Sequence, residues 1–164
     1  MSRNVLAAIA GATLLLTTGP ANAGVLYALD NSDDTLVVID TLSLAVSTVG
    51  SLGTDANFAG LAYDPYSDTM YMVGGRGNNN LFTLDRNTGA ASLVGSHGVA
   101  DLFGLAFDSR NNVLFGSQFS GGKGLYSLDL TDGSATVING SMSNGIGGLA
   151  YDWMNDRLVG MSDG

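Results

Sequence analysis

The chain has no cysteine and no glutamate, and among its 164 residues it has one lysine, one histidine and two prolines. Without cysteine there is no disulfide to hold the fold together, so a hydrophobic core must do so alone. Glutamate and lysine are common on exposed helix faces, and their scarcity disfavours helices. Glycine (24 residues), asparagine, aspartate and serine are plentiful instead, and these residues form turns. The composition therefore predicts an all-β protein with short strands.

Basic residues are also scarce, because six lysines and arginines stand against fifteen acidic residues, all of them aspartate. The net charge is −9. No basic stripe is available to neutralise phosphates, so we expect no nucleic-acid partner.

The first 23 residues have the layout of a signal peptide. Arg3 gives the start a positive charge, an apolar stretch runs from Val5 to Leu16, and an Ala-Asn-Ala sequence ending at Ala23 supplies the cleavage site. The stretch is shorter than the roughly 20 residues that span a bilayer. We predict that 1–23 is removed, which leaves a chain with a net charge of −10 and no membrane span. The predicted location is secreted or periplasmic, with bacterial export the more economical reading; an uncleaved interfacial anchor is the alternative.

A segment that returns every 44 residues is the strongest pattern in the chain. Its copies are Gly60-Leu61-Ala62-Tyr63-Asp64, Gly104-Leu105-Ala106-Phe107-Asp108 and Gly148-Leu149-Ala150-Tyr151-Asp152. The residues that follow each copy repeat as well. A fixed period of this length indicates stacked supersecondary units.

Each full repeat unit consists of four short apolar runs separated by turn residues. The runs are 60–64, 70–74, 81–85 and 90–95 in one unit, and 104–108, 113–118, 125–129 and 134–139 in the next. The runs are apolar on both faces, as in sheets that are covered on both sides. Four-stranded units repeated in series are typical of the blades of a β-propeller.

The first and last units are incomplete. The first, 24–53, has counterparts of the second, third and fourth strands but lacks the first strand, and the last, 148–164, reaches only a second strand. Full units occupy 60–95 and 104–139. Propellers have at least about four blades, and many close by pairing a late strand with an early blade that lacks one. We therefore predict the N-terminal part of a propeller of about six to eight blades; a self-sufficient partial ring is the alternative.

These residues resemble the repeat of YVTN-type and NHL-type β-propellers, and the resemblance covers nearly all of 24–164. The matching elements are the strand Gly60–Asp64, the hydrophobe-Tyr-hydrophobe-Val strand Met70–Val73, the strand end Leu84-Asp85 and the turn Thr88-Gly89. The chain departs from the NHL pattern at 74–80, which lacks the Asn-His-Arg signal, and it has no Trp-Asp dipeptide of the WD type. The resemblance implies a fold but no single function, since such propellers include binding modules, enzymes and scaffolds.

Aspartates recur at the ends of the first and third strands of the units. They are Asp64, Asp108 and Asp152, and Asp40, Asp85 and Asp129. Aspartate side chains cap tight turns by accepting a hydrogen bond from an amide two residues further on. We therefore predict that these residues are structural.

Function is expected in the loops that differ between units, where strand four leads to the next strand one and strand two leads to strand three. Asn57 and Asp101 each stand three residues before a strand-one glycine, and Asn144 lies beside the equivalent position. Together they are predicted to form a polar ring. With Asp55 they are also the candidate ligands for a calcium ion, although their spacing is not that of an EF-hand. No other cofactor is indicated.

Two catalytic hypotheses rest on the same loops. His97 follows Ser96 and precedes Asp101 by four residues, which suggests a nucleophile, a base and an orienting carboxylate. Asp55 and Asp101 are alternatively a carboxylate pair for glycoside cleavage. Gluconolactonase-like propellers use a metal with a glutamate ligand, and this chain has no glutamate. Whether the chain is an enzyme stays open at this point.

Aromatic residues fall into two groups. Those at repeated positions are expected to be core rather than a carbohydrate platform: Tyr63, Tyr71, Phe82, Phe107, Phe115, Tyr126 and Tyr151. Phe58, Phe103 and Phe119 lie in or beside variable loops and are candidates for exposed contacts, with sealing of the central funnel as the alternative. Trp153 falls in a turn on the opposite face.

The sequence favours an exported propeller that acts as a binding or scaffolding module, with a protein or carbohydrate ligand on its loop face. One alternative is a propeller lyase or hydrolase acting on a sugar or lactone through His97, Asp101, Asp55 and Asn144. Another is a structural cell-surface protein whose acidity gives solubility and repulsion. An apolar patch on the loop face would favour a protein partner.

Overall fold

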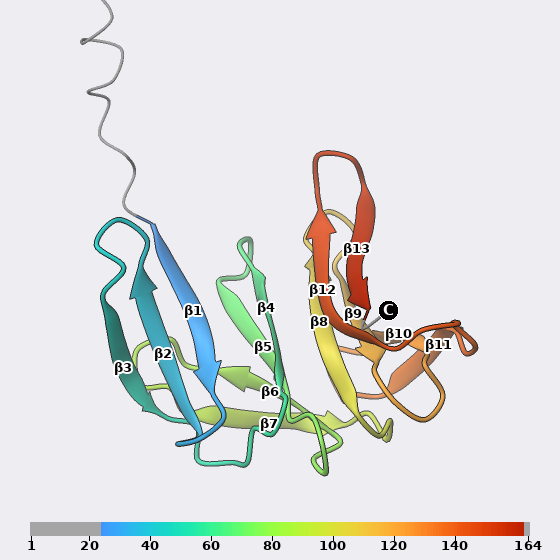
Figure 1. Ribbon diagram of the computed structural model, residues 1–164, viewed down its shortest axis with the longest axis horizontal. Coiled ribbons are helices and arrows are strands. Elements are labelled where there is room, and N and C mark those ends of the chain that lie inside the picture. The colour runs from blue at the N-terminus through green and yellow to red at the C-terminus, as the bar shows by residue number, and fades with distance from the viewer. Residues whose placement is uncertain (1–23, 163–164) are drawn as a thin grey trace, which may run out of the picture.

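The computed structural model describes residues 24–162, which form thirteen β-strands and no helix (Figure 1). In this part of the chain no helix is long and apolar enough to cross a membrane. The predicted signal peptide, 1–23, lies outside the described residues, as do 163–164.

The strands form four antiparallel sheets, which we call blades 1 to 4, and each blade keeps its strands in chain order. Blade 1 contains β1 (Val25–Asp30), β2 (Thr35–Asp40) and β3 (Val46–Ser51); blade 2 contains β4 (Gly60–Asp64), β5 (Thr69–Val73), β6 (Asn80–Leu84) and β7 (Ala91–Ser96). Blade 3 contains β8 (Leu102–Asp108), β9 (Val113–Gln118), β10 (Leu125–Leu128) and β11 (Ala135–Asn139); blade 4 contains β12 (Ile146–Asp152) and β13 (Arg157–Ser162). The predicted strands are confirmed, and β8 and β12 begin two residues earlier than predicted.

The blades share their irregularities as well as their strands. The pairing of the third strand with the fourth shifts register at Leu36/Val37, Leu81/Phe82 and Leu125/Tyr126. The first strands β8 and β12 shift register just before Gly104 and Gly148. Bulges of this kind bend and twist a strand locally, so equivalent strands of different blades are bent at equivalent places.

The first strands β4, β8 and β12 lie side by side along the inner edge of the arc of blades (Figure 1). A Cβ atom added to Gly60 would lie 3.1 Å from the Cβ of Leu105, and one added to Gly104 would lie 3.1 Å from the Cβ of Leu149. These two pairs are equivalent in the 44-residue repeat. Glycine at this position allows neighbouring blades to approach closely, and the blades are arranged radially as predicted.

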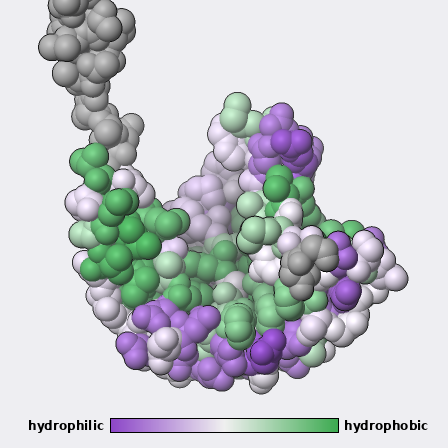
Figure 2. All heavy atoms as spheres, viewed as in Figure 1, coloured by the Kyte–Doolittle hydropathy of each residue, from purple (hydrophilic) through white to green (hydrophobic). Residues whose placement is uncertain are grey.

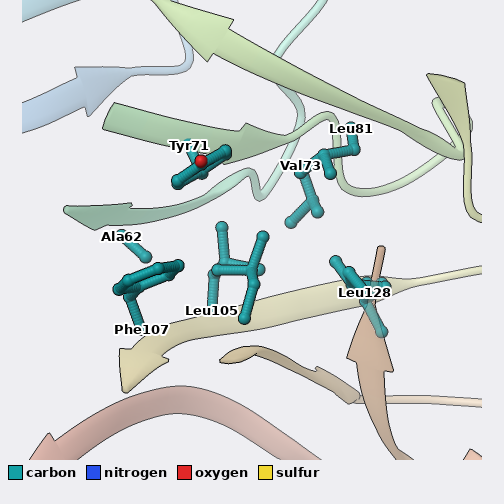
Figure 3. Close-up of a cluster of buried hydrophobic side chains, with 9 residues drawn as sticks. Ala62, Tyr71, Val73, Leu81, Leu105, Phe107 and Leu128 are labelled. Atoms are coloured by element: carbon teal, nitrogen blue, oxygen red, sulfur yellow. The ribbon is translucent and has the colours of Figure 1, made fainter. Parts of the chain in front are cut away.

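The largest core cluster lies between blades 2 and 3 (Figure 3). Tyr71 of β5 stacks on Phe107 of β8, with ring centroids 5.6 Å apart. Leu81 and Leu105 are almost completely buried beside them. A second cluster, which includes Leu36, Met72 and Phe82, joins blade 1 to blade 2.

Blade 1 lacks the inner strand that the other blades have, as the sequence predicted. Its edge strand β1 exposes Val25 (59%) and Leu26 (56%), and a cavity of about 410 Å³ separates these residues from Leu61 and Tyr63 of β4. Figure 2 shows hydrophobic residues gathered over this end of the molecule.

The recurring aspartates cap turns in every blade, which confirms their predicted role. After the first strands, Asp64 accepts from the Tyr66 amide (3.0 Å) and Asp108 from the Arg110 amide (3.0 Å). After the third strands, Asp85 accepts from the Asn87 amide (2.8 Å). Burial raises the pKa of the Asp64 and Asp108 carboxyls, but their hydrogen bonds outweigh burial and hold the pKa below its usual value.

Candidate functional site

We call the side of the blades that carries the loops 52–59, 74–79, 97–101 and 119–124 the loop face. Here the loop entering a blade is bound to the loop between that blade's second and third strands. The Arg76 amide donates to the Asn57 carbonyl (2.7 Å), and the Phe119 amide donates to the Asp101 carbonyl (3.0 Å). Asn57 and Asp101 thus occupy equivalent places, and both position a neighbouring loop through the backbone.

Three phenylalanines from three separate segments form one stack on this face. The Phe58 and Phe103 ring centroids are 5.4 Å apart, and those of Phe103 and Phe119 are also 5.4 Å apart. The interplanar angles are 21° and 19°. Phe58 is 53% exposed, whereas Phe103 is 8% exposed. The stack therefore has a buried middle ring, Phe103, and one exposed end, Phe58.

Arg76 lies over the stack. Its guanidinium carbon is 4.9 Å from the Phe58 centroid and 5.7 Å from the Phe103 centroid, which places a cation over aromatic rings. Its Nε lies 3.8 Å from Oδ1 of Asp101, and the Ser120 hydroxyl donates to Oδ2 of Asp101. The Arg76 side chain is still 53% exposed, so it remains available to a ligand.

The backbone at this site is unusual. Phe58 has φ = 58° and Asp101 has φ = 52°. A bulky aromatic residue rarely adopts this left-handed conformation, which persists only where the surroundings enforce it. The loops therefore hold the Phe58 ring and the Asp101 carboxylate in their places.

A cavity of about 470 Å³ opens at this stack, and its walls include the three phenylalanines, Arg76, Asn31 and Gly147. This volume lies within the usual range of ligand sites, about 300–1,000 Å³. The walls come from all four blades, because Asn31 follows β1 and Gly147 lies in β12. The site exists only when the blades are packed side by side.

Among residues 24–162 no hydrogen bond or ion pair joins the remaining predicted site residues, Asp55 and Asn144, to Asn57 or Asp101. Asp55 is exposed, and its carbonyl accepts from the Asn78 side chain (3.0 Å). Asn144 is half-buried. Within residues 24–162 no group of three histidine, cysteine or acidic side chains could hold a metal ion. The calcium site therefore stays a prediction from the sequence.

His97 is buried, with 5% of its surface exposed. Its Nδ1 accepts from the Val99 amide (3.2 Å), its Nε2 has no partner among the described residues, and burial lowers its pKa to about 4. In the described part of the chain, no hydrogen bond or ion pair joins His97 to Asp101 or Asp55. A catalytic role of His97 with Asp101 or Asp55 therefore stays a hypothesis from the sequence, and no contact described here supports it.

Two features of the surface were missed from the sequence. Arg76 lies in a loop whose glycine-rich sequence resembles that of a phosphate-binding loop. Only the scarcity of basic residues in the chain could have drawn attention to it. Tyr63 was expected in the core, but it is 41% exposed, because no inner strand of blade 1 packs against it. That expectation was wrong for Tyr63, and Tyr151 is only half-buried.

No protein-family model and no curated protein matches the chain. Solved structures are similar in fold. A chain in a nidogen/laminin complex superposes with a TM-score of 0.70 at 12% identity, covering 86% of this chain and 53% of that one. The fold is a partial β-propeller. An auxiliary nutrient binding protein from Bacteroides thetaiotaomicron gives a TM-score of 0.63 at 17% identity, covering 87% of this chain and 34% of that one.

A structural genomics protein of unknown function from the same bacterium gives a TM-score of 0.64 at 16% identity, covering 88% of this chain and 37% of that one. The propeller described here thus spans about half or less of the length of these neighbours. Identities this low support a common fold and no more.

Proposed function

We propose that the chain is an exported propeller that acts as a binding module, and that its loop face binds a protein partner. The observation that carries this proposal is the stack of Phe58, Phe103 and Phe119 beneath the exposed guanidinium of Arg76. Export rests on the signal-like sequence of the first 23 residues.

The chemistry of the cavity favours an apolar side chain over a sugar. The phenylalanine rings offer no hydrogen-bonding group. In the amide orientation that satisfies its neighbours, Asn31 donates to the Ala56 carbonyl (2.7 Å) and accepts from the Phe58 amide (3.3 Å), so its polar atoms are already engaged. Sugar hydroxyls would find few hydrogen-bonding partners here, whereas an apolar side chain needs none.

Arg76 adds a second requirement to the ligand. Its guanidinium is shared with Asp101 at 3.8 Å and half exposed, so a carboxylate of the partner can bind it as well. The site therefore fits a peptide segment that places an acidic side chain next to an aromatic or aliphatic one. Aromatic residues and arginine are enriched at the centres of protein interfaces.

Selection from random peptides displayed on phage tests this proposal. We expect the mature chain to enrich peptides that combine an apolar and an acidic residue. The variant Phe58→Asn removes the exposed ring but keeps the left-handed backbone, which asparagine tolerates. It should weaken binding of the selected peptides about tenfold or more.

Leu44→Asn is the matched control, because Leu44 is also exposed (74%) and left-handed (φ = 59°) but lies in a turn of blade 1 on the other face. Peptide binding should survive in this variant. If no peptide is enriched, or if both variants weaken binding equally, the loop face is not a protein-binding site.

A further inference from the structure

Another cavity lies on the side of the blades opposite the loop face, which we call the turn face because the turns 65–68, 109–112 and 153–156 lie there. Its volume is about 460 Å³. The residues that shape it come from blades 2, 3 and 4: Tyr63, Tyr66, Phe107, Arg110, Tyr151 and Trp153. None of them lines the loop-face cavity, so the two sites are separate.

Several aromatic side chains around this cavity are exposed to solvent. Tyr66 is 80% exposed, Trp153 is 63% exposed and Tyr63 is 41% exposed. Exposed aromatic side chains that gather around one hollow indicate a binding site rather than ordinary surface. Unlike the phenylalanines of the loop face, tyrosine and tryptophan present an apolar ring together with a hydrogen-bonding atom.

Two of the tyrosine hydroxyls are held in fixed positions. The Tyr63 hydroxyl donates to Asp68, and the Tyr151 hydroxyl donates to Asp156. These hydrogen bonds raise the pKa of both phenols, so both keep their protons. Because each proton is used, the phenol oxygens offer lone pairs that accept hydrogen bonds from a ligand.

Arg110 supplies a charge that forms no ion pair among residues 24–162. Its guanidinium carbon lies 5.9 Å from the centroid of the Trp153 ring. The other arginines of residues 24–162 form ion pairs: Arg76 with Asp101, Arg86 with Asp68, and Arg157 with Asp152. Within the same residues, the Arg110 side chain has neither an ion pair nor a hydrogen bond. With fifteen acidic residues in the chain, an arginine without an ion pair is an exception.

The carboxylates of the neighbouring turns are already engaged. Asp68 pairs with Arg86, and Asp152 pairs with Arg157. Asp108, which begins the turn that contains Arg110, accepts from the Asn111 side chain at 2.7 Å and from the Arg110 amide at 3.0 Å. Among the described residues no carboxylate lines the cavity itself, although the Asp108 carboxylate lies close enough to the Tyr151 hydroxyl to help raise the pKa of that phenol. A ligand carboxylate is therefore the fitting partner for the Arg110 guanidinium.

We propose that the turn-face cavity binds a saccharide that carries a carboxylate, such as a uronic acid residue. The C–H face of the sugar ring packs against the exposed rings of Trp153 and Tyr66. Its hydroxyls donate to the phenol oxygens of Tyr63 and Tyr151, and its carboxylate binds the Arg110 guanidinium. The C–H face, the hydroxyls and the carboxylate of such a sugar thus each have a matching kind of group in the cavity. The proposal does not depend on the function of the loop face.

Trp153 is the only tryptophan of the chain, so its fluorescence reports on this cavity alone. The probes are D-glucuronate and D-glucose, which differ only in the carboxylate, and benzoate, which has a carboxylate without hydroxyls. We expect glucuronate to change the fluorescence of the protein in a saturable way. Glucose and benzoate should each bind at least about tenfold more weakly.

Arg110→Gln should weaken glucuronate binding about tenfold, because a charge-assisted hydrogen bond is lost. Among the described residues its side chain makes no hydrogen bond or ion pair and contacts only the Trp153 ring, and thermal unfolding checks that the variant folds. Lys123→Gln, which removes an equal charge on the loop face, should bind glucuronate as the parent chain does. Absence of a saturable response, equal binding of glucose or benzoate, or equal behaviour of the two variants would overturn the proposal.

Discussion

The two faces of the blades are built by different rules. On the turn face, equivalent residues make equivalent contacts: Asp64 and Asp108 each accept from the amide two residues further on, in both cases at 3.0 Å. On the loop face, equivalent positions share only a backbone contact. Asp101 uses its side chain to bind Ser120 and approach Arg76, and the equivalent Asn57 is not an acid. The repeat thus maintains the scaffold, and its variable positions carry the individual chemistry.

The largest effect on the free energy of unfolding is expected in the core between blades 2 and 3, which supports both faces. Leu105 of the inner strand β8 is 3% exposed within the core between blades 2 and 3. Leu105→Ala should lower the free energy of unfolding by about 2–5 kcal/mol, measured in urea. Leu93→Ala, at a residue that is 64% exposed, is the control and should change it by less than about 0.5 kcal/mol. Equal losses would mean that β8 is not an inner strand.

Substitution of a buried aspartate cap on the turn face should have the next largest effect on the free energy of unfolding. Asp108 is 3% exposed and satisfies two backbone amides and one side-chain amide. Asp108→Ala leaves these donors without a partner and should cost about 2 kcal/mol of unfolding free energy. Asp85→Ala, which removes the exposed aspartate cap after the third strand of blade 2, should cost less. The comparison would be wrong if the exposed cap mattered more than the buried one.

Acid should affect the two faces in separate pH windows. Burial lowers the pKa of His97, in a loop of the loop face, from 6.5 to about 4. The unfolded chain therefore binds a proton that the folded chain does not, and stability falls as the pH drops from about 6.5 towards about 4. Between about pH 7 and pH 5 the loss should be on the order of 1 kcal/mol. His97→Asn, which keeps an acceptor for the Val99 amide, should abolish this slope in urea titrations.

The turn-face aspartates should respond only in stronger acid. The pKa values of Asp64 and Asp108 lie below the ordinary value of 3.8 in the folded chain, so the stability that these carboxylates contribute is present above that pH and is lost as the pH falls through the lower values. A His97→Asn variant that still loses stability between about pH 7 and pH 5 would contradict the assignment of this window to the histidine.

The smallest effect on stability is expected at the loop-face site itself. The Arg76–Asp101 pair is exposed at Arg76 and 3.8 Å long. Arg76→Gln should change the unfolding free energy by less than about 0.5 kcal/mol, although it should weaken the peptides selected on the loop face. A thermal unfolding curve that drops with this substitution would show that the site is part of the scaffold.

Much of the fold could be predicted from the sequence, because local signals recur. The strands, the aspartate caps and the missing inner strand of blade 1 all follow from the 44-residue repeat. Phe58, Phe103 and Phe119 could be singled out because they depart from that repeat. Their stacking under Arg76 could not be predicted, because it depends on how loops from different blades approach each other. The exposure of Tyr63, by contrast, follows from the inner strand that blade 1 lacks, so the repeat contained the signal for it.

The central claim is that neighbouring blades meet along their inner strands in the same way each time. Proton–proton nuclear Overhauser effects in a solution NMR spectrum test it most directly. The account predicts cross-peaks from the Gly60 α-protons to the Leu105 side chain and from the Gly104 α-protons to the Leu149 side chain, since a Cβ atom added to either glycine would lie only 3.1 Å from the Cβ of the leucine. Contacts of Gly60 with its own blade alone, or with residues unrelated to Leu105, would contradict the radial arrangement.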